Sequence, residues 1–357
     1  MKLSVLILFI LCSSCGMLSY LTEQGLGQAR IQWRGQDNEK VLDDPKVPEE
    51  IKQKILLVGE YKKFFYHYFS EKSTDIYSKT TILDDEAVTY LVIASPHTKI
   101  EAHEFEFPLL GAFPYIGFFK LDSAKEFAKD LEKDEELVTY IRPVYAYSTL
   151  GYLEDRILSS FFEYDSMELA ELIFHELFHT IFFVEDEVDL NENLANLYGF
   201  ELLKEYFKDR EELQGYIQRE EKKKVIAHRI VELIGILQAE FGKLGGFITT
   251  EKADELTQRF VTEVLKPEIR QLCEKLELEK KDCEMKGEWN QARFAAFLTY
   301  EEEQDFLKAL KDGLGLDLKQ FFSYLKKEMK LYKKQKEFDS FPDYLKSKVK
   351  HAPAPPH

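Results

Sequence analysis

Residues 165–184 read DSMELAELIFHELFHTIFFV, and this stretch predicts the central helix of the protein. Asp165 and Glu168 have the D-x-x-E spacing of a capping box, so the helix is expected to run from Ser166 to about Val184. Apolar side chains occupy most of the other positions: Leu169, Leu172, Ile173, Phe174, Leu177, Phe178, Ile181, Phe182 and Phe183. A helix that is apolar on nearly all sides is expected to be buried.

Three polar side chains, His175, Glu176 and His179, stand within this apolar helix in an H-E-x-x-H arrangement. Histidines four positions apart lie one above the other on a helix, so both imidazoles can reach one ion. Glu176 would then lie beside a bound water, whose pKa zinc lowers to about 7, and could take its proton. Burying these groups is costly unless they are paired or bind a metal. The alternative is a pair of core histidines satisfied by hydrogen bonds.

Two histidines leave a catalytic zinc site one protein ligand short. Glu192 is expected in the first turn of a second helix, which should start near Asn191, and antiparallel packing would bring it back to the histidines. Asn196, one turn further on, is expected to support a ligand by hydrogen bonding. Glu187 and Asp189 are the reserve choices for the third ligand. Glu192 could instead only favour the helix N-terminus electrostatically.

The segments around this helix pair differ in character. Alternating apolar residues and Gly/Pro turns predict short strands in residues 80–119 and a strand from Leu137 to about Tyr147. Helical spacing predicts helices over residues 21–69, interrupted at Asp43–Pro45 and at Pro48. The regions expected are a leader (1–15), a region around the central helix (21–205), a charged helical region that closes a cleft (206–345) and a disordered tail (346–357).

The composition is that of a globular protein and excludes one class of partner. Hydrophobic residues make up 45% of the 357 residues, and 65 acidic against 48 basic residues give a net charge of −17. Such a chain is repelled by phosphate backbones and anionic lipid surfaces, and no basic stripe reverses this locally. We expect no nucleic-acid partner, and membrane contact only through an N-terminal anchor.

The first residues resemble a bacterial export signal. Lys2 precedes the apolar run Leu3–Leu11, which is shorter than the roughly 20 residues of a membrane-spanning helix. Two serines and then Cys15 resemble a lipoprotein processing site, in which Cys15 would be lipidated; Cys12 departs from that pattern. An uncleaved anchor or simple secretory cleavage are the alternatives. With lipidation, the protein is expected on the periplasmic side of the cell envelope, at the outer rather than the inner membrane.

Two cysteines stand in the body of the chain, Cys273 and Cys283. In an oxidising compartment they could form a disulfide across a helix-turn-helix. On one continuous helix they would instead lie roughly 15 Å apart, too far to bridge. Neither has a histidine at metal-binding spacing, so they are not interpreted as a metal site.

Several motifs together resemble the family of bacterial zinc aminopeptidases, most of which are predicted lipoproteins of similar length. The resemblance covers about Leu18 to Leu310 and departs from the family at Phe178, where a small residue is common, and at Val144-Tyr145. Its motifs are HELFHTIFF (175–183), NENLA (191–195), VYAYSTLGYLED (144–155), Gly27-Gln28, Asp43-Asp44-Pro45, PLLGAFPYIGFF (108–119) and Asn290-x-Ala292-Arg293. Because the family takes its name from the zinc motif, the resemblance implies metal and fold more than substrate.

Two further segments are expected to complete the site. In zinc peptidases of this general class an edge strand holds the extended substrate by backbone hydrogen bonds. The segment expected to do so runs from Tyr145 to Gly151 and includes Tyr147, Ser148, Thr149 and Gly151, of which the last three could equally be turn residues. A tyrosine or an arginine could stabilise the oxyanion, and Tyr300 is chosen among 19 tyrosines. Asn290 and Arg293 are expected to contact substrate, with helix packing as the alternative.

Taken with the resemblance, these features predict an α+β, zincin-like fold, in which a small sheet covers the metal helix. The predicted protein is a monomeric zinc peptidase with one Zn²⁺ per chain, a peptide substrate and Glu176 as base and then acid. The alternatives are an envelope-anchored zinc protein without catalysis and a scaffold with the same fold. An aminopeptidase also needs an acidic group for the free amine of its substrate, and the sequence offers too many carboxylates to select one.

Overall fold

The computed structural model describes most of the chain between residues 19 and 349. The described residues are 19–107, 111–146, 149, 153–185, 187–244, 248–283, 285, 287–299, 304–335 and 337–349. The expected leader with Cys15, the chain beyond residue 349 and the expected site residues Tyr147, Ser148, Gly151 and Tyr300 lie outside them. No helix within the described ranges is both long enough and apolar enough to cross a membrane.

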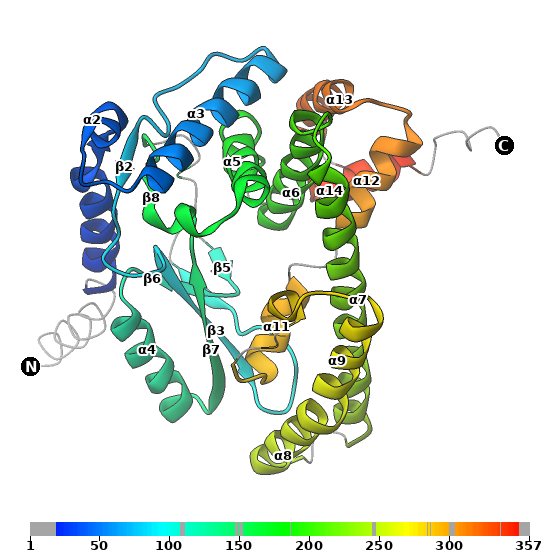
Figure 1. Ribbon diagram of the computed structural model, residues 1–357. Helices are drawn as coiled ribbons and strands as arrows, with labels where there is room; N and C mark the ends of the chain where they lie inside the picture. Colours follow the sequence, from blue (N-terminus) through cyan, green and yellow to red (C-terminus); the bar gives the residue numbers. More distant parts are fainter. Residues whose placement is uncertain are drawn as a thin grey trace, which may run out of the picture.

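Helices make up most of this part of the chain and pack beside small sheets, so the fold is α+β as predicted (Figure 1). The first helix occupies residues 19–34, and α2 (Asn38–Asp43) and α3 (Glu49–Phe69) follow it. The predicted interruption is confirmed, because α2 ends at Asp43 and Pro48 is the residue before α3. Proline lacks a backbone N–H and is therefore tolerated at a helix start rather than in a helix interior.

The strands form two three-stranded sheets and one two-stranded sheet among the described residues. In the first, β2 pairs antiparallel with β1 and parallel with β8; in the second, β3 lies between β6 and β7 and is antiparallel to both; β4 pairs with β5. The strands are β1 (Gln36–Asp37), β2 (Lys79–Thr81), β3 (Thr89–Pro96), β4 (Phe105–Phe107), β5 (Gly111–Phe113), β6 (Ile116–Phe118), β7 (Leu137–Val144) and β8 (Ile157–Leu158).

Strand β7 lies at the edge of its sheet, with helix α4 (Leu121–Asp134) packed against it. The strand begins at Leu137 as predicted but ends at Val144, not near Tyr147. Val144 is paired with Thr89, which is the first residue of β3, so β3 offers no strand partner further along. A strand ends where its ladder of backbone hydrogen bonds ends, and the prediction was therefore too long.

The central helix pair consists of α5 (Ser166–Ile181) and α6 (Val188–Tyr206), which lie side by side (Figure 1). The predicted start of α5 is confirmed. The Asp165 carboxylate accepts a hydrogen bond from the Glu168 backbone N–H, and the Glu168 carboxylate accepts one from the Asp165 N–H. Both helix boundaries at the connection differ from the prediction, since α5 ends three residues before Val184 and α6 begins three residues before Asn191.

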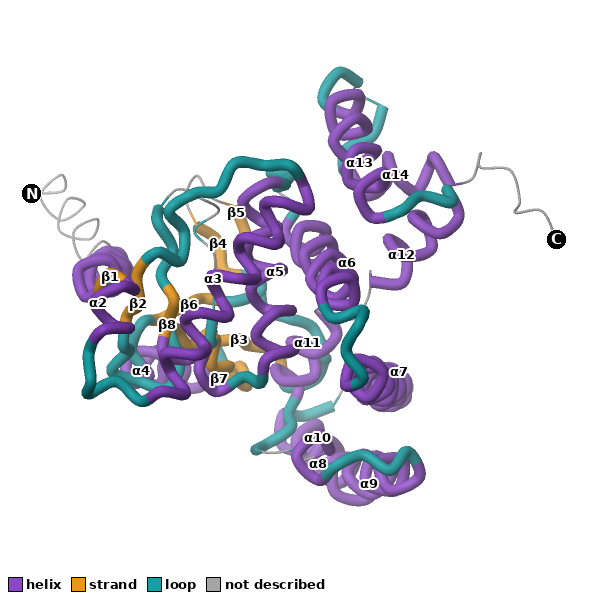
Figure 2. The backbone as a smooth tube through the Cα atoms, turned by 45° about the horizontal axis from the view of Figure 1, so that its top comes forward, coloured by secondary structure: helices purple, strands orange, loops and turns teal. Residues whose placement is uncertain are grey.

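The helices after α6 form two groups with the long helix α7 between them (Figure 2). One group contains α8, α9 and α10, and the other α12, α13 and α14, while α11 packs on β3 and β7. These helices are α7 (Glu212–Leu244), α8 (Thr250–Phe260), α9 (Lys266–Lys275), α10 (Lys280–Cys283), α11 (Gln291–Thr299), α12 (Gln304–Gly313), α13 (Leu318–Tyr332) and α14 (Phe341–Val349), with a π-helical turn, Val261–Leu265, between α8 and α9. The tail was predicted to be disordered from residue 346, but α14 runs to Val349, because Tyr344 and Leu345 are buried and hold it in place.

A disulfide joins Cys273 to Cys283, with the two Cα atoms 6.0 Å apart. Of the two alternatives that the sequence left open, the structure therefore shows the bridged one. Helix α9 ends at Lys275 and α10 begins at Lys280, so the chain turns between the two cysteines. One continuous helix would have kept their sulfur atoms apart.

The largest apolar core lies around α5 and contains side chains of α3, α6, α13 and α14. Aromatic rings fill much of it: Phe178 of α5 stacks on Tyr198 of α6 with ring centroids 4.2 Å apart, and both are fully buried. The sequence prediction that α5 is buried over most of its surface is confirmed. A helix enclosed in this way is held rigidly, which is a requirement for a precisely spaced site.

Candidate metal centre

Two side chains of α5 and one of α6 converge where these helices pack together. The Nε2 atoms of His175 and His179 lie 3.2 Å apart. The Glu192 carboxylate places one oxygen 3.4 Å from His175 Nε2 and the other 3.4 Å from His179 Nε2. Tetrahedral coordination with bonds of about 2.0–2.1 Å sets neighbouring ligand atoms roughly 3.3 Å apart. The three side chains could therefore hold one metal ion.

The reserve ligands proposed from the sequence do not take part in this cluster. Glu187 accepts a hydrogen bond from the backbone N–H of Phe341, at 2.8 Å, and Asp189 is exposed at the start of α6. Glu192 is placed differently because it lies one turn into α6, on the side that faces α5. The antiparallel return expected from the sequence is the arrangement that the structure has.

The connection between α5 and α6 is fixed by Asn191, which the sequence analysis assigned no role. Its buried side-chain amide accepts a hydrogen bond from the Val184 N–H at 2.9 Å and donates one to the Val184 carbonyl at 2.7 Å. These two bonds supply hydrogen-bond partners to the N–H and carbonyl groups of Val184, which lies outside the helix. They explain why α5 ends earlier than predicted. They also hold the neighbouring Glu192 in register with the histidines.

Gly199 allows α6 to approach α5 closely enough for the cluster to form. A Cβ atom at this position would lie 3.0 Å from the carbonyl oxygen of Glu171 and 3.4 Å from the Cβ of His175. Both neighbours belong to α5, and one of them is backbone that cannot rotate away. A side chain here would therefore push the helices apart near the ligands.

Replacing Gly199 with alanine is expected to lower the free energy of unfolding by about 1–3 kcal/mol and to weaken metal binding, because Glu192 moves with α6. Denaturant unfolding and a competition titration with a zinc chelator would measure the two effects. Gly235→Ala is the matched control, since Gly235 is exposed in α7 and has nothing within 4 Å of the added Cβ. Equal behaviour of the two variants would contradict the role given to Gly199.

Burial and the contacts among the three side chains shift their pKa values, and the two effects often oppose each other. Burial lowers the pKa of His179 to about 4, and the neighbouring His175 adds to this effect. Burial also lowers the pKa of His175, but the hydrogen bond to Glu192 and the charge of Glu176 outweigh it and leave a net rise. The pKa of Glu192 is raised by burial but lowered more by both histidines. His179 is therefore neutral near pH 7, as a metal ligand must be.

Glu176 lies beside the ligands and is almost completely buried. Burial raises its pKa to about 7; His175 opposes the rise and Glu192 adds to it. Its Oε2 atom has no hydrogen-bond partner among the residues that the structure describes. A carboxylate with a pKa near neutrality and one unused acceptor is suited to taking up and releasing a proton.

A cavity of about 300 Å³ opens beside these residues. Its walls come from the end of β7 and the two residues after it (142–146), from Tyr164 ahead of α5, from Glu171, Leu172, His175 and Glu176 of α5, and from Asn196 of α6. Asn196 also hydrogen-bonds with the His175 imidazole. The cavity therefore combines a base, a potential metal site and the end of an edge strand.

Comparison with known families adds one finding to this geometry. A family described as "Putative aminopeptidase" matches residues 19–339. The chain belongs to this family. The match includes β7, α5, α6 and every residue of the cavity wall, and membership supports a peptidase activity. Similar searches found no match among curated proteins or among solved structures.

Three of the substrate-contacting residues expected for an aminopeptidase can be placed, and none of them lines the cavity. The backbone N–H of Thr149 donates to the Asp155 carboxylate at 3.0 Å. Asn290 donates to the carbonyl of Thr139 at 2.9 Å and accepts from the N–H of Arg293. The Arg293 guanidinium lies over the Trp289 ring, 4.1 Å from its centroid, and over the ring of Tyr140 of β7, 5.3 Å from its centroid. Asn290 and Arg293 thus fix α11 against β7, which is the helix-packing alternative.

Sequence reasoning missed three polar residues of the cavity wall, Arg142, Tyr164 and Glu171. A signal existed for Glu171, because it precedes His175 by four positions and so lies on the same helix face. Arg142 and Tyr164 carry no such signal. They reach the cavity through the pairing of β7 with β3 and through the turn that leads into α5.

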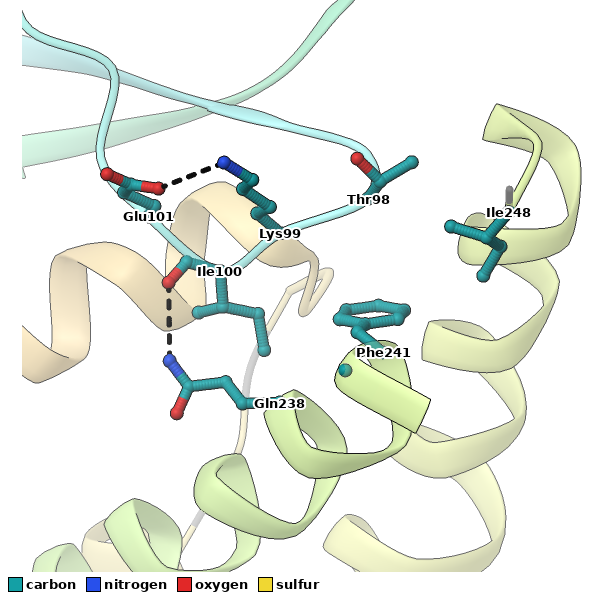
Figure 3. A pocket seen from close by; sticks show the side chains of 8 residues that line it. Thr98, Lys99, Ile100, Glu101, Gln238, Phe241 and Ile248 are labelled. Atoms are coloured by element: carbon teal, nitrogen blue, oxygen red, sulfur yellow. Dashed lines mark hydrogen bonds and ion pairs between the residues drawn. The ribbon is translucent and has the colours of Figure 1, made fainter. Parts of the chain in front are cut away.

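A larger cavity, of about 410 Å³, lies elsewhere in this aminopeptidase-family chain (Figure 3). It is formed by the loop 98–101 and the end of α7, and Gln238 donates to the Ile100 carbonyl at 3.3 Å across it. Phe241 and Ile248 contribute apolar surface. It shares no residue with the metal cluster or its cavity, and the described residues of its wall include no histidine or cysteine. The volume of a cavity alone therefore does not identify the functional site.

Proposed function

We propose that the protein is a zinc-dependent aminopeptidase with a zincin-like site, in which His175, His179 and Glu192 hold one Zn²⁺. The observation that carries the proposal is the 3.2 Å spacing of the two imidazole Nε2 atoms, each of which lies 3.4 Å from one of the two Glu192 oxygens. Two imidazoles and one carboxylate are a donor set typical of catalytic zinc. Family membership supports the same class of reaction.

The residues around the ligands supply the other parts of a hydrolytic site. Zinc, when bound, would activate water and polarise the scissile carbonyl. Glu176 takes a proton from the attacking water and then delivers it to the leaving amine. Burial raises its pKa to about 7 in the metal-free chain, and this raised basicity favours uptake of the proton. Tyr164 and Arg142 line the same cavity and would donate hydrogen bonds to the oxyanion.

The substrate peptide would lie along the end of β7. This strand is at the edge of its sheet, and residues 142–144 line the cavity together with Tyr145 and Ala146. An edge strand can bind an extended peptide through backbone hydrogen bonds. The arrangement supports the expectation that the chain before the metal helix contacts substrate, with Tyr145 and Ala146 of the expected segment and residues 142–144 ahead of it as the proposed contacts.

The alternative function is an envelope-anchored zinc protein without catalysis. A structural zinc site is usually closed by four protein ligands, whereas the cluster in the described residues offers three. Glu176 would also have no use in a closed site, although it is buried at a cost next to the ligands. Both observations favour the catalytic interpretation.

The proposed location is the periplasmic side of a bacterial envelope, with an anchor at Cys15. The disulfide between Cys273 and Cys283 supports this proposal, because disulfides persist in oxidising compartments. Labelling with a radioactive fatty acid, compared between the natural chain and Cys15→Ser, would test the anchor directly.

The purified protein is expected to contain about one zinc per chain and to lose it in the double variant His175→Ala/His179→Ala, because the remaining carboxylate cannot hold the ion alone. Elemental analysis measures the metal, and peptide digestion with and without a chelator measures the activity. The control double variant His67→Ala/His228→Ala removes two exposed histidines and should keep both the zinc and the activity. Failure to bind any transition metal after zinc addition, or zinc retained in the first variant, would refute the proposal.

A further inference from the structure

Two of the described residues that line the metal-site cavity are acids, Glu176 and Glu171. Glu176 is assigned to the attacking water, which leaves Glu171 without a part in the reaction. It is placed one helical turn before His175 on the same face of α5. Four residues correspond to a rise of about 6 Å along the helix. Glu171 therefore lies beside the reaction centre, at a fixed offset from it.

The Glu171 carboxylate is held in place but is not neutralised. The Tyr216 hydroxyl of α7 donates a hydrogen bond of 2.6 Å to its Oε2 atom. No ion pair and no second hydrogen bond to this carboxylate occurs among the described residues. The nearby Lys223 is paired with Glu220 at 2.8 Å. Burial raises the pKa of Glu171, against the opposing hydrogen bond from Tyr216, so a cation that entered the cavity would be bound favourably.

The offset suits the amino terminus of a peptide. In a peptide chain the nitrogen lies about 2.5 Å from the carbonyl carbon of its own residue. When the carbonyl of the first residue lies at the metal ligands, the terminal ammonium group lies a few ångströms from that carbonyl. A carboxylate that binds this ammonium group must therefore lie roughly one helical turn from the metal ligands. A substrate extended beyond this residue would place an uncharged amide and further chain against the buried carboxylate, which is unfavourable.

We propose that Glu171 binds the free α-ammonium group of the substrate, positioned by the Tyr216 hydroxyl, and thereby restricts cleavage to the first peptide bond. This inference rests on the proposed function and adds to it the residue that distinguishes an exopeptidase from an endopeptidase. Glu171 contacts substrate directly, whereas Tyr216 is a positioning residue that acts through it.

The test compares one short peptide with a free amino terminus and the same peptide acetylated at that terminus. The zinc-loaded protein is expected to cleave the first bond of the free peptide and to leave the acetylated one nearly intact. Glu171→Gln should lower kcat/KM for the free peptide by about 10- to 100-fold, mainly through KM, because the negative charge opposite the ammonium group is lost. Zinc content should stay the same, and the preference for the free terminus should collapse.

Binding provides a second measurement that does not depend on turnover. In the Glu176→Gln background, calorimetry should show tighter binding of the free than of the acetylated peptide, and adding Glu171→Gln should remove that difference. Tyr216→Phe keeps the carboxylate but removes the hydrogen bond that positions it. The affinity for the free peptide should therefore fall a few-fold, while the preference for the free over the acetylated peptide is retained. Glu220→Gln is the charge control, since Glu220 lies near Glu171 but outside the cavity wall, and it should behave as the natural chain.

The outcomes separate the two proposals. If the natural chain cleaves both peptides equally, or if Glu171→Gln keeps the full preference for the free terminus, the role of Glu171 is wrong while the zinc peptidase stands. If the zinc-loaded chain cleaves neither peptide and binds neither in the Glu176→Gln background, both proposals fall together. A melting temperature of Glu171→Gln within a few degrees of the natural value excludes unfolding as the cause.

Discussion

Replacing Glu176 with glutamine is expected to lower kcat by about 10²- to 10⁴-fold while one zinc per chain is retained. Glutamine has nearly the same shape, so His175 and His179 keep their positions, but it cannot accept a proton from the attacking water. Burial raises the pKa of Glu176 to about 7 in the metal-free chain, so its carboxylate is a stronger base than an exposed glutamate, and glutamine has no such basicity. Steady-state kinetics on a free-terminus peptide, together with elemental analysis, measure both quantities.

Glu185→Gln is a suitable comparison for this variant. Glu185 lies in the exposed connection after α5 and is not part of the metal cluster or the cavity wall. Its replacement changes the net charge by the same amount and should leave kcat unchanged. A Glu176→Gln protein that retains zinc and works within tenfold of the natural rate would show that another group takes the proton.

Replacing Phe178 with alanine is expected to lower the free energy of unfolding by about 3–5 kcal/mol. The ring is 1% exposed and stacks on Tyr198 at 4.2 Å, with Phe322 at 6.0 Å also in contact range, so its removal leaves a large cavity in the main core. Phe178 stands between the two histidines of the cluster in sequence but points into the core. Urea unfolding followed by circular dichroism would measure the change.

Phe183→Ala provides the control for this substitution. Phe183 follows α5 and is 40% exposed, so its truncation should cost less than about 1 kcal/mol. Phe178 is also one of the positions at which the chain departs from the family resemblance, since a small residue is common there. If Phe178→Ala lowers the free energy of unfolding by less than about 1 kcal/mol, Tyr198 and Phe322 must move to fill the space that the ring occupied.

Features encoded by neighbouring residues could be predicted from the sequence, and features set by distant partners could not. The start of α5 followed from the local pair Asp165 and Glu168, and its capping box is present. Its end did not, because the backbone of Val184 is bound by the side chain of Asn191 from the next helix. The end of β7 was missed for the same reason, since it depends on where β3 begins.

The candidate site divides in the same way. His175, Glu176 and His179 follow from the spacing of one helix, and Glu192 from the antiparallel return of the next. Glu171 could not be selected among 65 acidic residues, because its distinction is the cavity beside it and the hydroxyl group from α7. Asn290 and Arg293 were chosen from a family-like motif, but their contacts with Thr139 and Tyr140 of β7 account for both side chains.

The three potential ligands all come from one helical hairpin, between residues 175 and 192. Closing so short a segment of chain costs little loop entropy, and the cost grows only with the logarithm of the loop length. Ion binding would thus depend on a compact sequence unit, whereas much of the cavity wall lies outside it, in β7 and the two residues after it, in Tyr164 and in the first part of α5. Under the proposed function, substitutions in those segments would alter which peptides are accepted without rebuilding the metal site, so substrate preference and metal affinity could change independently of each other.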